Sequence, residues 1–187
     1  MAKRTELLCI HEGKQGSSID PVFINRLIKS LKPAWIRPFG SNSVRLEACG
    51  SRKELIARMP EHLRACINAG GNVTLMVWAD VDDDMQDPDA LLKCFWDEAK
   101  NAGIAKAEFD QVVFSFAKDR IENWIEFLTI GSTDESQEGP RVHHNKVVRE
   151  AALTLAGRCR GERGPDLPPS LAWSCRNWRA LVDRMQA

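Results

Sequence analysis

Three carboxylates in the first half of the chain stand where they could hold a metal ion. Glu12 follows a short apolar run, and Asp80 and Asp82 follow a longer one at 72–79. Asp80 and Asp82 are two residues apart, so their side chains project to the same side of an extended chain. Carboxylate oxygens are the ligands that Mg²⁺ prefers, and an ion held by them can bind a phosphate oxygen and activate water. If the two apolar runs form neighbouring strands, these residues predict a site for Mg²⁺ or Mn²⁺ that acts on phosphate esters.

Further acidic residues extend this candidate metal site. Asp84 lies in the acidic run that follows the second apolar segment, and Glu122 lies near the start of a later helical segment. Glu122 would share one helical face with Asp119 and Glu126, because residues three and four apart are neighbours on a helix. These residues could complete a second metal site, as two-metal hydrolysis requires. The alternative is a solvated acidic helix face that binds nothing.

The elements that must position these carboxylates follow from the spacing of apolar residues. Short apolar runs predict strands, and a spacing of three to four predicts helices. The predicted strands cover residues 6–11, 34–39, 72–79 and 109–116, and the predicted helices that follow them cover 20–32, 51–69, 87–102 and 120–130. Pro60 is a point at which the helix over 51–69 could divide in two. This alternation favours an α/β fold with a parallel sheet of about four strands, right-handed crossovers and flanking helices.

The order of these motifs resembles that of the Toprim family, the catalytic domain shared by primases, topoisomerases and certain bacterial nucleases. That family has a Glu at the end of its first strand and an Asp-x-Asp at the end of its third. Here the matching residues are Glu12, followed by Gly13, and the pair Asp80 and Asp82. The resemblance covers about residues 5–130 and implies a compact, Rossmann-like parallel α/β fold. It also implies that Glu12 acts as general acid/base or metal ligand, and that the two aspartates hold Mg²⁺ or Mn²⁺ for phosphodiester chemistry.

A segment around the end of the fourth predicted strand resembles, in particular, the small stand-alone nucleases of this family. Residues 114–126 put polar side chains, Glu122 among them, where the strand meets its helix, and are similar to the same region of small Toprim-like proteins. Comparable nuclease domains occur in overcoming-lysogenization-defect proteins, which join them to an ATPase. The resemblance therefore implies a nuclease of a bacterial defence or mobile-element system, and any ATPase that it needs would be a separate chain.

Charge is distributed unevenly along a chain that is neutral overall. The 187 residues include 26 Lys or Arg and 26 Asp or Glu, yet residues 80–140 hold 16 of the acidic side chains and only 5 of the basic ones. The basic ends suit a phosphate backbone, so nucleic acid, either DNA or RNA, is the expected partner. The candidate contacts with it are Lys14, Lys118, Arg120, Lys146 and Arg149.

Two units are expected along the chain. Residues 1–131 form the Toprim-like α/β domain, and residues 132–187 form a basic, helical C-terminal appendage packed on it. The appendage contains predicted helices at 143–159 and 170–185. Its arginines are interleaved with two tryptophans, a combination that suits phosphates and unstacked bases, although tryptophans on a short amphipathic helix more often belong to a core.

Other kinds of chemistry are either excluded or kept as alternatives. The chain has no tyrosine, so it cannot form the phosphotyrosyl intermediate of topoisomerases, and Leu8 stands where a Walker A motif ending in Gly13-Lys14 would need glycine. One alternative is a non-catalytic Toprim-like module that recruits a partner or senses a nucleotide. Another is a phosphatase of the haloacid dehalogenase type, which also uses Asp-x-Asp after an apolar strand. Against the phosphatase, Asp83 follows the motif here, where that family has Thr or Val.

Cysteines and hydropathy indicate the environment of the protein. The six cysteines are widely spaced and include no Cys-x-x-Cys, so free thiols in a reducing compartment are expected. The longest uncharged stretch, at 65–79, contains Asn and Gly and cannot span a bilayer. We therefore expect a cytoplasmic protein with no membrane partner.

Overall fold

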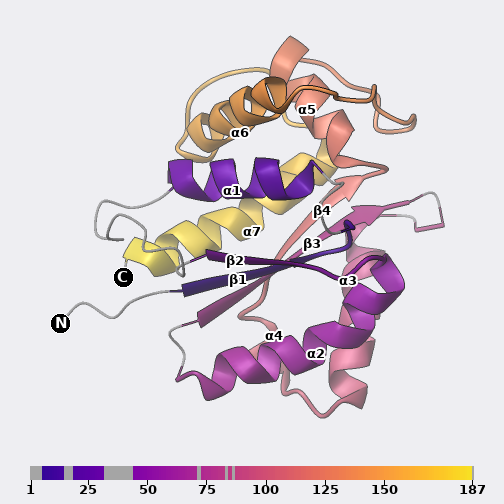
Figure 1. Cartoon of the computed structure of the whole chain (residues 1–187), viewed down its shortest axis with the longest axis vertical. Helices are drawn as coiled ribbons and strands as arrows, with labels where there is room; N and C mark the ends of the chain where they lie inside the picture. The colour runs from indigo at the N-terminus through magenta and orange to yellow at the C-terminus, as the bar shows by residue number, and fades with distance from the viewer. Residues whose placement is uncertain are drawn as a thin grey trace.

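One parallel β-sheet organises the chain (Figure 1). The computed structural model describes residues 6–14, 19–31, 44–70, 73–82, 84–85 and 87–186. The strands are β1 (Glu6–His11), β2 (Val44–Ala48), β3 (Val73–Val81) and β4 (Val113–Lys118), arranged in the order β2-β1-β3-β4 and paired in parallel throughout. The predicted α/β class with a parallel sheet of four strands is thus confirmed, and β1 and β3 are neighbours.

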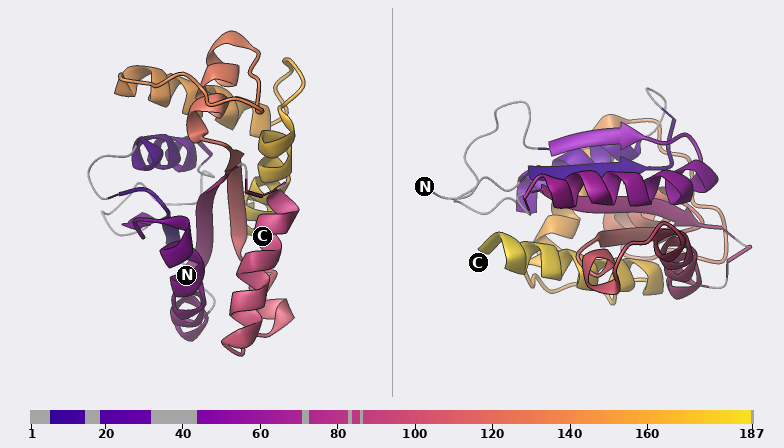
Figure 2. Two further views of the ribbon diagram at one scale, coloured as in Figure 1. Left: turned by 90° about the vertical axis from the view of Figure 1, so that its right-hand side faces the viewer. Right: turned by 90° about the horizontal axis from the view of Figure 1, so that it is seen from below.

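Helices cover both faces of the sheet (Figures 1 and 2). One face carries α1 (Asp20–Leu31), α5 (Ile121–Ile130) and α6 (Asn145–Cys159), and the other carries α2 (Arg52–Asn68), α3 (Pro88–Asn101) and the short α4 (Lys106–Phe109). The last helix, α7 (Pro169–Gln186), runs beside the edge strand β4. None of the helices in the described part of the chain is long and apolar enough to cross a membrane.

Alternation along each strand divides the core between these two faces. In β1, Leu7 and Cys9 pack in the cluster under α1, whereas Leu8 and Ile10 pack in the cluster over α2, and all four are buried. Residues 75–79 of β3 are likewise buried on both faces. This double burial explains why the two strands appear in the sequence as continuous apolar runs rather than as alternating ones.

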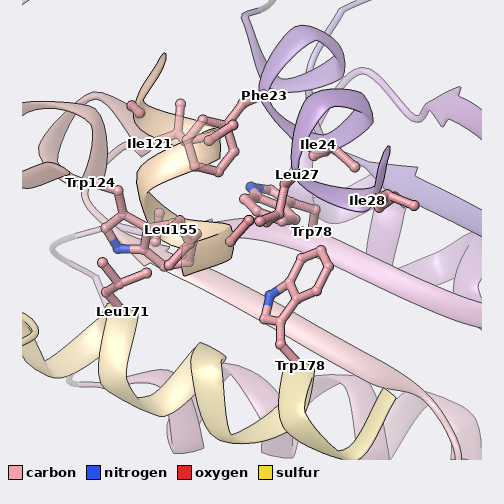
Figure 3. Close-up of a cluster of buried hydrophobic side chains, with 14 of the residues drawn as sticks. Phe23, Ile24, Leu27, Ile28, Trp78, Ile121, Trp124, Leu155, Leu171 and Trp178 are labelled. Atoms are coloured by element: carbon pink, nitrogen blue, oxygen red, sulfur yellow. The ribbon is translucent and has the colours of Figure 1, made fainter. Parts of the chain in front are cut away.

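Trp78 lies at the centre of the core on the α1 face (Figure 3). Its ring makes edge contacts with Phe23 of α1, Trp124 of α5 and Trp178 of α7, with ring centroids 5.9, 5.5 and 5.7 Å away. Such edge-to-face pairs stabilise a core beyond the area that they bury. Helix α7 therefore shares the core of the sheet, and Trp178 is buried in it rather than free to stack on a base.

Helix α7 also covers the outer edge of β4. Ser174 accepts a hydrogen bond from the backbone nitrogen of Phe116 at 2.9 Å and donates one to the oxygen of the same residue at 3.2 Å. Ser170 accepts from the N–H two residues further along β4 at 3.1 Å, and Asn177 donates to the oxygen of Phe114 at 3.2 Å. These polar side chains, four and three residues apart on the helix, match the two-residue repeat of the strand. They satisfy backbone groups that an uncovered edge would offer to another chain.

The region between β1 and β3 departs from two predictions. The strand predicted at 34–39 lies outside the described residues, and β2 forms where periodicity predicts no element, because Arg45 and Glu47 interrupt its apolar residues and none of the strand is fully buried. The division of the helix at Pro60 is wrong, since α2 runs unbroken through it. The Pro60 ring is buried, so its packing offsets the one backbone hydrogen bond that a proline forfeits.

Candidate functional site

The topology of the sheet places the candidate site at the carboxyl ends of β1 and β3. The chain leaves β1 for α1 on one face and leaves β3 for α3 on the opposite face. In open α/β sheets, ligands bind where neighbouring crossovers diverge in this way. His11 pairs with Trp78 across the two strands, so Glu12 and Asp80 lie at the same edge of the sheet. The first and third strands are thus neighbours, which is the condition under which the carboxylates at their ends were expected to lie close together.

Glu12 and Asp80 are joined by a hydrogen bond between their carboxyl groups. Burial is the main cause that raises the pKa of Glu12 to about 7; the hydrogen bond with Asp80 opposes this rise, and the nearby charge of Asp82 adds to it. Burial also raises the pKa of Asp80 well above its usual range, with the charge of Glu12 as the next cause. Two half-buried carboxyls this close do not both ionise easily, which favours a state in which the pair shares one proton.

A pocket of about 340 Å³ opens beside Asp80, and two more carboxyl groups line it. Asp20 begins α1, and Glu122 lies in the first turn of α5. Helix starts carry partial positive charge, which favours carboxylates at these positions. Burial raises the pKa of Glu122, and the charge of Asp20 adds to that increase. Together with Glu12, four carboxyl groups therefore influence one another at this edge of the sheet.

Basic side chains complete the lining of the pocket. Arg120 precedes α5, and Arg141 and His143 come from the loop between α5 and α6. This loop passes directly over the start of α5 at Gly139, where a Cβ atom would lie only 2.7 Å from the backbone nitrogen of Asn123. The buried Asn123 side chain also donates to a carbonyl of the same loop at 2.9 Å. A residue without a side chain is therefore needed at 139 for the loop to bring Arg141 and His143 to the pocket.

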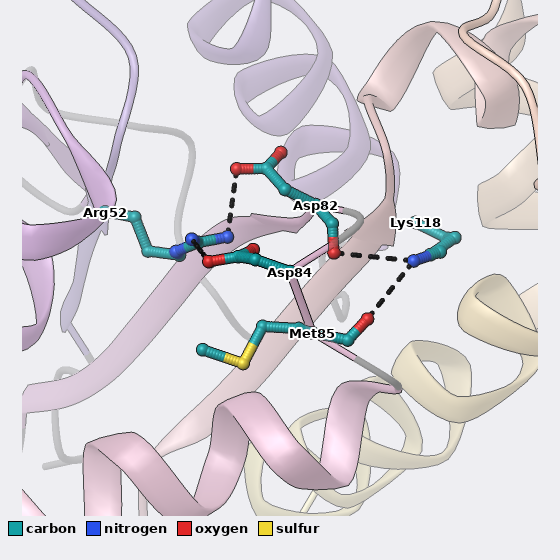
Figure 4. A network of polar contacts seen from close by, with 5 residues as sticks. All are labelled: Arg52, Asp82, Asp84, Met85 and Lys118. Carbon is teal, nitrogen blue, oxygen red and sulfur yellow. Dashed lines mark hydrogen bonds and ion pairs between the residues drawn. The ribbon is translucent and has the colours of Figure 1, made fainter.

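The other predicted metal ligands of the acidic run, Asp82 and Asp84, are both bound to an arginine (Figure 4). Arg52, at the start of α2, donates from Nη1 to Asp82 at 2.9 Å and from Nη2 to Asp84 at 2.7 Å. The strand ends at Val81, so the alternation that would direct Asp80 and Asp82 to one side does not continue. Asp82 lies close enough to raise the pKa of Glu12, but the pocket lining contains Asp80 and not Asp82.

The predicted nucleic-acid contacts nearest the two strand ends differ in their surroundings. Lys14 is exposed, two residues after Glu12. Lys118, at the end of β4, is half-buried and donates from Nζ to the backbone oxygens of Asp82 and Met85 at 3.5 and 3.4 Å (Figure 4). Lys14 is thus open to a ligand, whereas Lys118 holds the loop that follows β3.

The remaining predicted nucleic-acid contacts lie around α5 and α6. Arg120 lines the pocket and forms an ion pair with Glu138. Lys146 is exposed in the first turn of α6, where its Nζ lies 3.8 Å from Glu150, and Arg149 is exposed one turn later. Of these three, only Arg120 lines the carboxylate pocket.

The predicted acidic face of α5 is only partly realised. Helix α5 begins at Ile121, so Asp119 precedes the helix, in a left-handed backbone conformation with φ of 62°. Glu126 accepts a hydrogen bond from the hydroxyl of Thr133 at 2.8 Å, one turn further from the sheet edge than Glu122. The prediction that these three acidic residues share one face was therefore wrong for Asp119, and Glu122 alone of them lines the pocket.

Three polar residues of the pocket, Asp20, Arg141 and His143, are absent from the individually predicted site residues, although Arg141 is one of the appendage arginines expected to suit phosphates. Asp20 carries an ordinary helix-start signal, which hides its second role. Its position after β1 does place it at the carboxyl edge of the sheet, and that signal could have identified it. Arg141 and His143 depend on the path of the loop over Gly139, for which the sequence offers no comparable pattern.

The clustered groups suit a hard cation in their chemistry. All four are carboxyls, the ligand type of Mg²⁺ and Mn²⁺. The buried Oε2 atom of Glu12 has no hydrogen-bond partner within the described residues, as expected of an oxygen that needs a positive partner. As they stand, no three acidic, His or Cys side chains of the described residues are grouped tightly enough to hold an ion. Binding would require side-chain rotations that break the hydrogen bond between Glu12 and Asp80.

A comparison of the chain with models of known protein families finds no match, and a comparison with curated proteins finds none either.

Proposed function

We propose that the protein is a metal-dependent phosphodiesterase that cleaves nucleic acid. The observation that carries this proposal is the hydrogen-bonded pair of Glu12 and Asp80 at the point where the crossovers from β1 and β3 diverge. Two half-buried carboxyls with raised pKa values destabilise each other when ionised, and a divalent cation would relieve that repulsion. Perturbed carboxyls in a pocket are more typical of a functional site than of a structural one.

Glu12, Asp20, Asp80 and Glu122 are the residues that would hold the cation. A Mg²⁺ or Mn²⁺ ion bound there would polarise a phosphate oxygen and lower the pKa of a bound water. Glu12, with a pKa of about 7, can accept a proton from an attacking water and release it again near neutral pH. Glu12 is therefore the acid/base group of the proposal, and its hydrogen bond to Asp80 places it at the site before the cation binds.

Arg141 and His143 are the side chains best placed to bind the substrate phosphate. Both line the same pocket as Asp80 and Glu122, and no ion pair or hydrogen bond of either side chain is found within the described residues. A guanidinium can donate two parallel hydrogen bonds to a phosphate, and a protonated imidazole can donate one more. A phosphodiester held by these groups would face the carboxyl cluster.

The resemblance to Toprim nucleases supports the same proposal. Glu12 directly follows β1, and Asp80 is the last residue but one of its parallel neighbour β3, which agrees with a Glu and an Asp at the ends of the first and third strands. The second aspartate of the motif, Asp82, is held by Arg52, so cation binding at Asp82 would have to compete with that ion pair. The role in bacterial defence and a separate ATPase partner rest on the resemblance alone.

A second candidate is a non-catalytic binding module with the same fold. The observation that favours it is the double ion pair of Arg52, which neutralises Asp82 and Asp84 without any metal. Such a module would bind a cation or nucleotide in the pocket and would release no product. Metal binding without turnover distinguishes it from the nuclease.

The experiment that separates these candidates is cleavage of labelled single- and double-stranded DNA and RNA in the presence of Mg²⁺ or Mn²⁺. The test variant is Asp80→Asn, which keeps the size of the side chain and removes its charge. The control is Asp97→Asn, because Asp97 lies exposed on α3 and forms a surface ion pair with Lys93 only. The proposal expects cleavage that a chelator abolishes, that Asp80→Asn lowers at least 100-fold and that Asp97→Asn leaves unchanged. Cleavage that survives in Asp80→Asn would place the activity elsewhere, and metal binding without cleavage of any substrate would favour the binding module.

A further inference from the structure

Two cysteines from the last two helices lie in direct contact. Cys159 is the final residue of α6, Cys175 lies in α7, and their Sγ atoms are 3.7 Å apart. All six cysteines of the chain lie in its described part and are free thiols, and no other two of them are in hydrogen-bond contact. A disulfide requires a sulfur separation of about 2.05 Å. Side-chain rotations that shorten the present 3.7 Å between the two Sγ atoms to this bond length would thus join Cys159 to Cys175.

Basic side chains surround this pair of thiols. The charges of Arg160 and Arg179 act on Cys159, and those of Arg158 and Arg179 act on Cys175. Positive charge beside a thiol stabilises the thiolate, which is the reactive form towards oxidants and disulfides. The two cysteines are also only partly buried, so a small oxidant can reach them.

The two thiols of the pair are not equivalent. The hydrogen bond from Cys175 lowers the pKa of Cys159, and the arginines lower it further. The pKa of Cys175 is raised, first by the same hydrogen bond and then by burial. Elsewhere in the chain burial raises the pKa of Cys9 and of Cys66, which have no sulfur neighbour in hydrogen-bond contact. The hydrogen bond and the neighbouring arginines thus favour the thiolate at Cys159, with the Cys175 sulfur in contact with it.

We propose that Cys159 and Cys175 are a redox modification site that forms a reversible disulfide on exposure to a peroxide. The thiolate of Cys159 attacks one peroxide oxygen and breaks the O–O bond, which yields a sulfenic acid; with hydrogen peroxide the leaving group is hydroxide, which takes up a proton from solvent and becomes one water. The thiol of Cys175 then attacks the sulfenic sulfur, and the hydroxyl leaves as a second water when it takes up the thiol proton. The two sulfurs are oxidised and the peroxide is reduced, so atoms and electrons balance. A dithiol reductant reverses the reaction by thiol–disulfide exchange.

The disulfide would tie the end of α6 to α7. Helix α7 covers the edge of β4 through Ser170 and Ser174, and α6 belongs to the helices on the α1 face of the sheet. The disulfide would therefore link these two helices covalently. The start of α6 follows the pocket residue His143, and 15 helical residues place Cys159 roughly 20 Å from that start. Oxidation should therefore stabilise the C-terminal helices and leave the carboxylate pocket intact. This inference does not depend on the proposed nuclease activity.

The test is to treat the reduced full-length protein with one equivalent of hydrogen peroxide and to map its peptides by mass spectrometry. The expected product is a pair of peptides cross-linked between Cys159 and Cys175, with a mass lower by two hydrogen atoms. Dithiothreitol should convert this product back to the two reduced peptides. Cys175→Ser should convert this product into a sulfenic acid on Cys159 that reacts with dimedone. The control Cys94→Ser should form the same cross-link as wild type, because Cys94 lies on α3. Arg179→Gln should slow cross-link formation near pH 7 several-fold, since one of the charges beside Cys159 is removed.

A different result would overturn the proposal. Peroxide that leaves both thiols unmodified, or that drives Cys159 to sulfinic acid without any cross-link in wild type, would show that the pair does not form a disulfide. A cross-link that joins other cysteines would do the same. Because the main measurement uses wild-type protein, poor folding of a variant cannot obscure the outcome.

Discussion

The carboxyl groups of Glu12 and Asp80 hydrogen-bond to each other across the ends of two neighbouring parallel strands. Glu12 raises the pKa of Asp80, whereas its hydrogen bonding with Asp80 lowers the pKa of Glu12, which burial raises overall. Asp20 and Glu122 extend the negative field through the adjoining pocket. This arrangement is unfavourable when all of its members are ionised, and a shared proton or, as proposed, a bound cation would relieve the repulsion. The predictions for the site follow from that relationship.

The stability of the metal-free protein should depend on pH through Glu12. A carboxyl whose pKa is raised by folding stabilises the native state below its unfolded pKa, and this contribution is lost as the pH rises through the folded value of about 7. Between about pH 4.5 and pH 7, the contribution of Glu12 to the free energy of unfolding should fall by about 3 kcal/mol. Urea denaturation at several pH values, in the presence of a chelator, measures this fall in the free energy of unfolding. Glu12→Gln should lack this part of the decline, and equal pH profiles for the variant and wild type would contradict the assignment.

Asp20 should contribute to cation binding although sequence motifs do not mark it. Asp20→Asn is expected to weaken the affinity for Mn²⁺ by about tenfold, because the negative field of the pocket decreases. Isothermal titration of Mn²⁺ into the folded variant measures the change, with Asp97→Asn as the matched control on the opposite face of the sheet. An affinity equal to that of wild type would remove Asp20 from the site.

Gly139 should be essential for the path of the loop that carries Arg141. An added Cβ would lie 2.7 Å from the backbone nitrogen of Asn123, which cannot move without disturbing the start of α5. We expect Gly139→Ala to lower the free energy of unfolding by about 2 kcal/mol, as an overpacked site does. Gly157→Ala is the control, because the added methyl there meets only the flexible side chain of Glu162. Chemical denaturation compares the two, and equal stability of both variants would show that the loop adapts freely.

The cover of the β4 edge by α7 should be measurable at Ser174. Ser174→Ala leaves the backbone nitrogen and oxygen of Phe116 without their partner in a buried place, which should cost about 2 kcal/mol of unfolding free energy. Thr154→Ala provides the control, since the Thr154 hydroxyl only donates to a carbonyl on the exposed side of α6. Greater aggregation of the Ser174 variant than of the control at equal concentration is also expected, because an edge strand becomes uncovered. A Ser174 variant as stable as the control would contradict the structural role of this contact.

The sequence predicts the parts of the fold that leave a strong local pattern. The double burial of β1 and β3 produces long apolar runs, and the carboxylates after them mark the functional edge of the sheet. Strand β2 leaves no such pattern, because an edge strand with Arg45 and Glu47 needs little apolar surface. The helix through Pro60 shows the opposite case, in which tertiary packing overrides a strong local signal.

The sequence predicts where the candidate site lies but not which residues belong to it. Asp80 and Asp82 look equivalent in sequence, yet β3 ends between them and the ion pair with Arg52 draws Asp82 out of the pocket lining. Arg52 lies 30 residues upstream of Asp82, and no local pattern relates the two. Asp20 was hidden for a different reason, since an aspartate at this position also has an ordinary role as a helix start, besides the ligand role proposed for it. Membership of such a site depends on where strands stop and loops cross, and these details are set by packing.

The most direct test of the site is to measure Mn²⁺ binding to wild type and to Asp80→Asn at pH 8. Electron paramagnetic resonance detects the bound Mn²⁺, and Mg²⁺ is added as the competitor. At this pH Glu12, whose pKa is about 7, is ionised, so protons compete with the cation mainly at Asp80, whose pKa is raised well above its usual range. Wild type should bind Mn²⁺ in a form that Mg²⁺ displaces, Asp80→Asn should lose at least tenfold in affinity, and Asp97→Asn should match wild type. Equal Mn²⁺ binding by wild type and the folded Asp80→Asn protein would show that Glu12 and Asp80 are not a cation site.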